Sequence, residues 1–229
     1  MVIEQYTITN KYNFPQPTID TTLPQRFLEQ SIYSLKQVQH QSFGLNPQEL
    51  QPFTSTEHCP FNLQLKPIPI SVKPDHQEAL IAAVDASTIR IGETPTGMIV
   101  AIRGATTWRQ NRMYKYTRLG PFIFHITEDN KNTLYYTLER AYFNTTYGST
   151  HQAAPNIMQM PIRLASLLER WLQTMLAKTV NNGVLLFDGS LTCGTPETPI
   201  QRLREILGCA RKKQSTGKLP SSRRKIPLT

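Results

Sequence analysis

A short apolar run that ends in an aspartate constrains this chain more than any other feature of its sequence. Residues 183–191 read Gly-Val-Leu-Leu-Phe-Asp-Gly-Ser-Leu, with a glycine at each side of the run. A continuous apolar run of this length between turn residues is typical of a strand that is buried on both faces. Asp188 therefore comes where the strand leaves the core, a common place for a functional side chain in an open α/β sheet.

The same pattern occurs once more, earlier in the chain. Residues 80–87 read Leu-Ile-Ala-Ala-Val-Asp-Ala-Ser and bring Asp85 to the end of a second apolar run. If the two strands are neighbours, two carboxylates meet at one edge of the sheet. Adjacent carboxylates repel each other, and a bound divalent cation offsets that repulsion. The sequence thus predicts a cation site that contains Asp85 and Asp188.

Hydrophobic periodicity predicts the order of the remaining elements. The expected strands are residues 79–88, 97–103, 113–126 and 185–187. The expected helices are residues 24–39, a helix that begins at Pro161 and ends before Gly183, and residues 199–213, and residues 134–143 could form another. The first three strands are expected to be antiparallel, and a crossover helix then leads to a parallel fourth strand. This order defines an α/β fold in which a mixed sheet is flanked by helices.

One carboxylate of the predicted crossover helix, that of Glu169, lies on the apolar side of the helix. The helical neighbours of Glu169 are Ala165, Leu172 and Leu176, which belong to the apolar side. An inward carboxylate needs a cation or a hydrogen-bond donor as its partner. A third metal ligand and a solvated surface residue are both compatible with this pattern.

Composition divides the chain into three parts. Residues 1–75 hold nine of the 17 prolines and are predicted to be a Pro-rich arm or extension, draped over the main domain or a partner subunit. Residues 76–213 are predicted to form the α/β domain. Residues 214–229 are predicted to be a basic, flexible tail.

The net charge of +9 favours a polyanionic partner such as DNA. Residues 106–112 are predicted to be a loop in which an aromatic side chain and two arginines could stack on bases and hold phosphates. A solvated basic loop with its tryptophan tucked inward is the alternative. The candidate nucleic-acid-binding residues are Arg103, Trp108, Arg109, Arg112, Arg211, Lys212 and Lys213.

Three cysteines without CxxC spacing argue against a disulfide framework or a zinc site, and they favour a reducing compartment. The sequence shows neither a signal peptide at its N-terminus nor a run of 18 apolar residues. We therefore expect a cytoplasmic protein without a membrane span.

Residues 81–87, the helix that bears Arg163 and Glu169, and residues 185–191 together resemble the first and central motifs of the NurA nucleases in order and spacing. The resemblance covers residues 78–213 and rests on three separated carboxylates and the Asp-Gly-Ser-Leu string. It implies an RNase H-like fold and a manganese-dependent DNA nuclease, for which Mg²⁺ is the alternative ion. Asp85, Glu169 and Asp188 would then be the catalytic metal ligands.

The resemblance also implies a homodimer that processes DNA ends in double-strand break repair with a HerA-like hexameric helicase. Members of the family commonly have glycine at the position of Ala86, and they continue beyond the position of Thr229 with a histidine and a tyrosine that assist the site. We therefore expect a chain that is short at its C-terminus relative to the family.

Two other functions remain open on sequence grounds. The chain could be a catalytically impaired subunit that keeps the fold and binds nucleic acid or a partner. It could also be an actin-like ATPase, although its first Asp-turn lacks the glycine that a phosphate loop needs.

Overall fold

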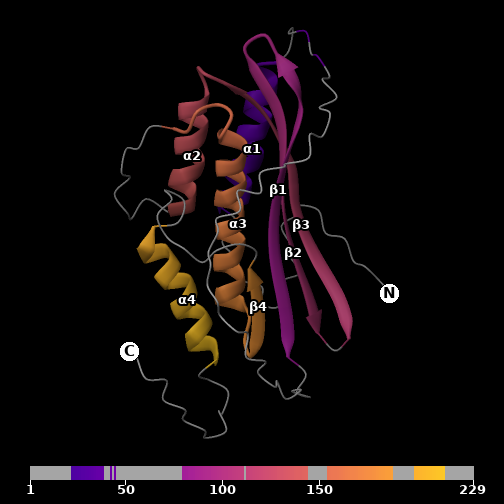
Figure 1. Cartoon of the computed structure of the whole chain (residues 1–229), viewed down its shortest axis with the longest axis vertical. Helices are drawn as coiled ribbons and strands as arrows, with labels where there is room; N and C mark the ends of the chain where they lie inside the picture. The colour runs from indigo at the N-terminus through magenta and orange to yellow at the C-terminus, as the bar shows by residue number, and fades with distance from the viewer. Residues whose placement is uncertain are drawn as a thin grey trace, which may run out of the picture.

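The computed structural model describes residues 22–38, 42, 44, 79–110, 112–143, 154–187 and 199–214. Within these ranges the chain forms a single sheet with the strand order β3-β2-β1-β4, together with helices α1 to α4. Helices α1 and α3 pack on one face of this sheet, while α2 and α4 pack against α3 on the side away from the strands (Figure 1). The helices therefore lie on one side of the sheet, and the core lies between them and that face.

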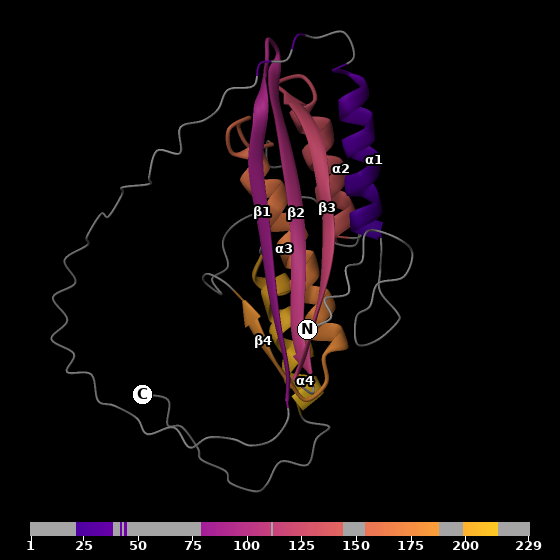
Figure 2. The same ribbon diagram turned by 90° about the vertical axis from the view of Figure 1, so that its right-hand side faces the viewer.

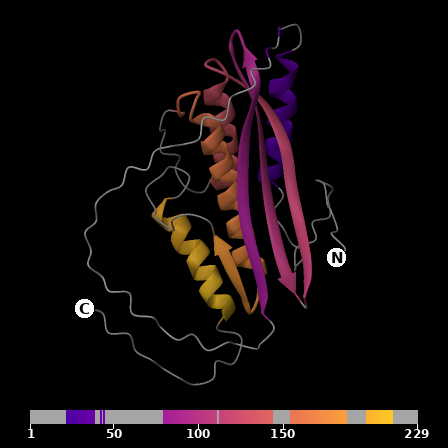
Figure 3. The ribbon, with the colours of Figure 1, turned by 45° about the vertical axis from the view of Figure 1, so that its right-hand side comes forward.

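The predicted mixed sheet is confirmed. Strand β2 (Gly97–Gln110) pairs antiparallel with β1 (Leu80–Thr94) on one side and with β3 (Met113–Thr127) on the other. Strand β4 (Gly183–Phe187) pairs parallel with β1, and Figure 3 shows it beside the lower part of β1. Strand β1, which carries Asp85, is thus an interior strand, as the sequence predicts.

The loop predicted at residues 106–112 is wrong for most of its length. Strand β2 continues to Gln110, because residues 106–110 pair with β1 or β3 along the ladder. The buried side chains of Thr106 and Trp108 show the strand alternation. Only a short hairpin turn separates β2 from β3, and Arg112 adopts a positive φ of 62° there.

Helix α1 (Thr22–Lys36) confirms the helix predicted near residues 24–39 and lies along β3, the edge strand. The ring of Phe27 lies 5.2 Å from that of Phe122 and 5.9 Å from that of Phe124, measured between centroids. This part of the Pro-rich segment therefore packs on the sheet. The rest of residues 1–75, except 37, 38, 42 and 44, lies outside the described residues, as does the tail after residue 214.

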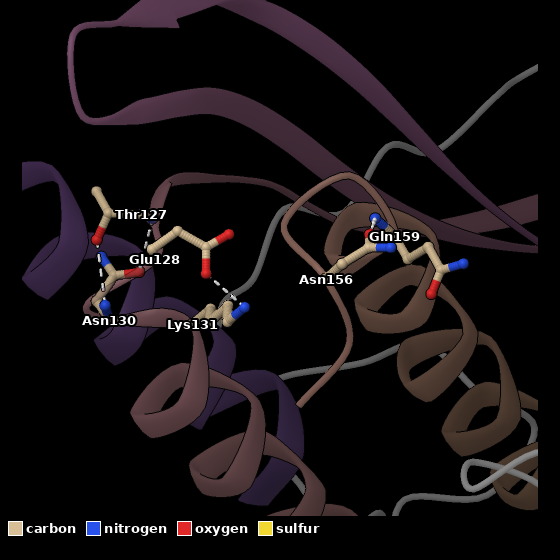
Figure 4. Close-up of polar contacts among 6 residues, drawn as sticks. All are labelled: Thr127, Glu128, Asn130, Lys131, Asn156 and Gln159. Atoms are coloured by element: carbon tan, nitrogen blue, oxygen red, sulfur yellow. Dashed lines mark hydrogen bonds and ion pairs between the residues drawn. The ribbon is translucent and has the colours of Figure 1, made fainter. Parts of the chain in front are cut away.

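Polar side chains define where the next two helices begin (Figure 4). At α2 (Lys131–Phe143), the backbone N–H of Thr127 donates to Asn130 Oδ1 at 3.0 Å, and the N–H of Asn130 donates to Thr127 Oγ1 at 3.1 Å. Before α3 (Met160–Thr179), Asn156 Oδ1 accepts a hydrogen bond of 2.9 Å from the N–H of Gln159. These bonds fix the turns that lead into the two helices.

Helix α3 is the central helix of the covering layer, and it packs closely on β2 at Gly104. A Cβ atom at this position would lie 2.7 Å from Leu172 Cδ1. Helix α4 (Ile200–Gln214) contacts α3, and Arg202 donates a hydrogen bond of 2.7 Å to the carbonyl of Tyr142. Among the described residues, no helix combines the length and the apolar character that crossing a bilayer requires.

Candidate active site

The two predicted strand ends lie side by side in the sheet. The last pair between β1 and β4 joins Val84 to Phe187, and each of these residues precedes an aspartate in the sequence. The predicted parallel pairing is therefore confirmed, but the predicted burial of this strand on both faces is wrong, because β4 is an edge strand and Val184 and Leu186 are exposed. The side chain of Asp85 is exposed, while Asp188 lies outside the described residues.

The direction of Asp85 follows from the register. Gly104 contacts α3 and pairs with Ala86, so Ala86 faces the helical layer. Successive side chains of a strand point to opposite faces. Asp85 therefore points to the other face of the sheet, which we call the open face because no described helix covers it. Figure 2 views the sheet from this side, with α3 and α4 behind the strands.

Glu169 lies beside buried residues of α3, as the sequence predicts. Ala165, Leu172 and Leu176 are 7%, 1% and 0% exposed. Glu169 itself is half-buried, and its Oε1 accepts a hydrogen bond of 2.9 Å from Gln173 Nε2. The amide of Gln173 is therefore one hydrogen-bond donor to this inward carboxylate.

Gln173 is held in turn by a second residue. Its side chain is fully buried, and its Oε1 accepts a hydrogen bond of 2.7 Å from Arg170. Only one orientation of the Gln173 amide lets its oxygen accept and its nitrogen donate these two hydrogen bonds. The hydrogen bonds from Arg170 through Gln173 therefore orient the carboxylate of Glu169. Nothing in the residue pattern singled out Gln173, although its spacing of four from Glu169 places the two on one helix face.

The described residues include two of the three predicted ligands, Asp85 and Glu169, and they do not form a metal cluster by themselves. No group of three His, Cys, Asp or Glu side chains in the described part of the chain could hold a metal ion. Asp85 points to the open face, while Glu169 belongs to the helix on the opposite face. Strand β4 ends at Phe187, so from Asp85 onward no described strand flanks β1 on that side.

The predicted nucleic-acid-binding residues separate into two groups. Arg103, Arg109 and Arg112 are exposed, as are Arg211 and Lys212 on α4. Trp108 is 4% exposed and belongs to the hydrophobic core, so the expectation that it stacks on bases is wrong and the inward alternative holds. The side chain of Lys213 lies outside the described residues.

The exposed aromatic partner of the arginines is a residue that the sequence pattern did not single out. Tyr114 is 52% exposed, and the guanidinium of Arg109 lies 5.8 Å from the centroid of its ring. Tyr114, Tyr116 and Arg118 alternate along β3, and that period of two marks them as one face of a strand. Trp108 lies on the opposite face of the sheet, in the hydrophobic core.

Comparisons with known proteins add no relative: no family model, no curated protein and no solved structure matches this chain. The fold and the candidate site therefore define the class directly. The chain is an α/β protein with a four-stranded mixed sheet that is covered by helices on one face.

Proposed function

We propose that this chain is a metal-dependent DNA nuclease of the NurA type with an RNase H-like domain, in which Asp85, Glu169 and Asp188 are the ligands for Mn²⁺ or Mg²⁺. The observation that carries the proposal is the register of β1 and β4. Val84 pairs with Phe187, and an aspartate follows each of them. Carboxylates at the ends of adjacent strands repel each other unless a cation lies between them.

The donor chemistry supports a hard divalent cation. Asp85 offers exposed carboxylate oxygens, and the amide of Gln173 fixes the orientation of Glu169. Mn²⁺ and Mg²⁺ prefer oxygen ligands of this kind. When bound, the ions would activate a water molecule and stabilise the leaving oxygen of a phosphodiester.

The chain's own residues would bind and orient the phosphate backbone. Arg103 lies on the open face two residues along β2 from the partner of Asp85, and its Nε donates a hydrogen bond of 3.0 Å to Ser87 Oγ. This bond holds the guanidinium close to Asp85. An arginine with one donor anchored and the others exposed is suited to holding a phosphate oxygen.

The resemblance to the NurA family supports the wider setting of this proposal: a cytoplasmic homodimer that processes DNA ends in double-strand break repair together with a HerA-like hexameric helicase. The second candidate is a catalytically impaired subunit that binds nucleic acid or a partner. The exposed cations Arg211 and Lys212 of α4 favour this second candidate, since they lie on a different element from the carboxylates.

A cleavage assay on end-labelled single- and double-stranded DNA tests the proposal, with Mn²⁺, Mg²⁺ or EDTA. The wild type is compared with Asp85→Asn and with Asp129→Asn, a matched change at an exposed aspartate in the turn before α2. We expect cleavage that requires the metal, is lost in Asp85→Asn and persists in Asp129→Asn. If Asp85→Asn cuts as well as the wild type, the proposed site is wrong. If none of the proteins cuts but all of them bind DNA, the second candidate replaces the first.

A further inference from the structure

The open face of the sheet carries an apolar half and a cationic, aromatic half that lie side by side. In the row farthest from Asp85, Val184 of β4 is level with Ile81 of β1, and Arg109 and Tyr114 continue the row on β2 and β3. The next row replaces these residues with Leu186, Ala83, Thr107 and Tyr116. We call these two rows the platform.

The platform exposes more apolar surface than a solvated sheet face requires. Ile81 is 37% exposed, Val184 48% and Leu186 52%. A sheet with one wet face normally places polar side chains there, and clustered exposed apolar residues mark a binding surface. The platform therefore has the composition of a surface that contacts a ligand.

The charges of the platform favour a polyanion. Apart from the two tyrosines, Arg109 is the only ionisable residue of the platform. The next row of the sheet contains Arg118, Ala105 and Asp85, which lie level with one another on β3, β2 and β1. A second copy docked by the same face would bring Arg109 near its own equivalent without a carboxylate in the platform to neutralise either one. A nucleic acid supplies the missing negative charge.

We propose that the platform binds single-stranded DNA and leads it toward Asp85. Unpaired bases can stack on Tyr114 and Tyr116 and lie against Ile81 and Leu186, while Arg109 and Arg118 hold phosphates. A duplex keeps its bases stacked inside and cannot use the tyrosines. The inference rests on the proposed function for the identity of the polymer, and it adds the strand state of the substrate.

Binding can be measured apart from cleavage. Fluorescence anisotropy with a labelled oligothymidylate and with a duplex of equal length, in EDTA, compares the wild type with Tyr114→Ala and Arg109→Ala. Tyr33→Ala is the matched control, because Tyr33 is 58% exposed but lies on α1, away from the platform. We expect the wild type to prefer the single strand, Tyr114→Ala to weaken its binding by about 5- to 100-fold, and Tyr33→Ala to leave it unchanged.

Arg109→Ala should weaken binding and lower the slope of log K against log salt by about 0.7, the contribution of one phosphate contact on a single strand. Equal affinity for duplex and single strand, with no effect of Tyr114→Ala, would overturn the inference. The inference would also be overturned if the wild type is a dimer, Leu186→Asp converts it to a monomer, and this variant binds oligothymidylate as well as the wild type does. The inference survives an inactive enzyme, since single-strand binding that depends on Tyr114 does not require cleavage.

Discussion

The hydroxyl of Ser31 bonds the backbone groups of Ile123 that would otherwise pair with a neighbouring strand. It donates a hydrogen bond of 2.7 Å to the carbonyl of Ile123 and accepts one of 3.0 Å from its N–H. One turn further along α1, the hydroxyl of Ser34 accepts a bond of 3.2 Å from the N–H of His125. The backbone groups that an edge strand leaves unpaired are therefore satisfied by side chains of a helix.

Replacing Ser31 with alanine should destabilise the protein by about 1–3 kcal/mol, because it leaves a partly buried backbone N–H and carbonyl of Ile123 without this partner. Urea unfolding measures the change. Thr137→Ala is the control, since that hydroxyl bonds only the carbonyl of Thr133 on the exposed side of its own helix. We expect a change within about 0.5 kcal/mol for the control. Equal effects of both substitutions would mean that the contact with the edge strand adds nothing.

Two glycines should respond to alanine in opposite directions. Gly104→Ala places a methyl group against Leu168 and Leu172 and should cost about 1–3 kcal/mol. Gly208 lies inside α4, and a Cβ atom added there would meet no described atom within 4 Å, so Gly208→Ala should stabilise the helix by about 0.5–1 kcal/mol. Thermal unfolding should show a lower melting temperature for Gly104→Ala and a higher one for Gly208→Ala than for the wild type. A neutral Gly104→Ala would show that α3 can move away from β2 at little cost.

The stability of the fold should fall in mild acid because of His125. Its side chain is 1% exposed, and burial lowers its pKa below the usual 6.5. The unfolded chain then takes up the proton more readily than the folded one, so stability is constant above about pH 7.5 and declines as the pH falls from about 6.5 toward the folded-state pKa. Denaturant unfolding from about pH 8 to about pH 5 measures the decline. In His125→Gln this part of the pH dependence should vanish, and an unchanged slope would assign it to other groups.

Gln173 should affect metal binding if the proposed ligands are correct. Gln173→Met keeps the volume of the buried side chain but removes both hydrogen bonds, so the carboxylate of Glu169 loses the donor that Gln173 supplies. We expect the Mn²⁺ concentration for half-maximal cleavage to rise about 10-fold or more, as for other residues that orient metal ligands. Gln25→Met on α1 is the control, since its amide donates a hydrogen bond to Glu29 at the surface of the same helix. A lower rate at saturating metal with an unchanged metal requirement would make Gln173 a purely structural residue.

The sheet was predictable because its strands have local sequence signals. Apolar runs and alternation revealed β1, β2, β3 and β4, and the spacing of apolar residues revealed α1, α3 and α4. The end of β2 was missed, because residues 106–112 include polar and charged side chains that are equally common in loops. Only the pairing partners on both sides distinguish the two, and these come from distant parts of the chain.

The candidate site was predictable to a different degree. The positions of Asp85 and Glu169 follow from periodicity, since one residue ends an apolar run and the other lies beside apolar helix neighbours. The buried state of Trp108 and the exposure of Tyr114 depend on which face of the ladder the helices cover. Tertiary packing determines which face of the sheet the helices cover, and the local sequence does not indicate it.

The pairing of β1 with β4 joins segments roughly a hundred residues apart in the chain, so it forms only when most of the domain is present. During synthesis, a ribosome-bound chain that ends before residue 183 contains Asp85 and Glu169 but lacks the strand that precedes Asp188. A nuclease with the proposed ligands acquires its complete set only after residue 188 has been synthesised, so shorter nascent chains would be harmless to the DNA around them.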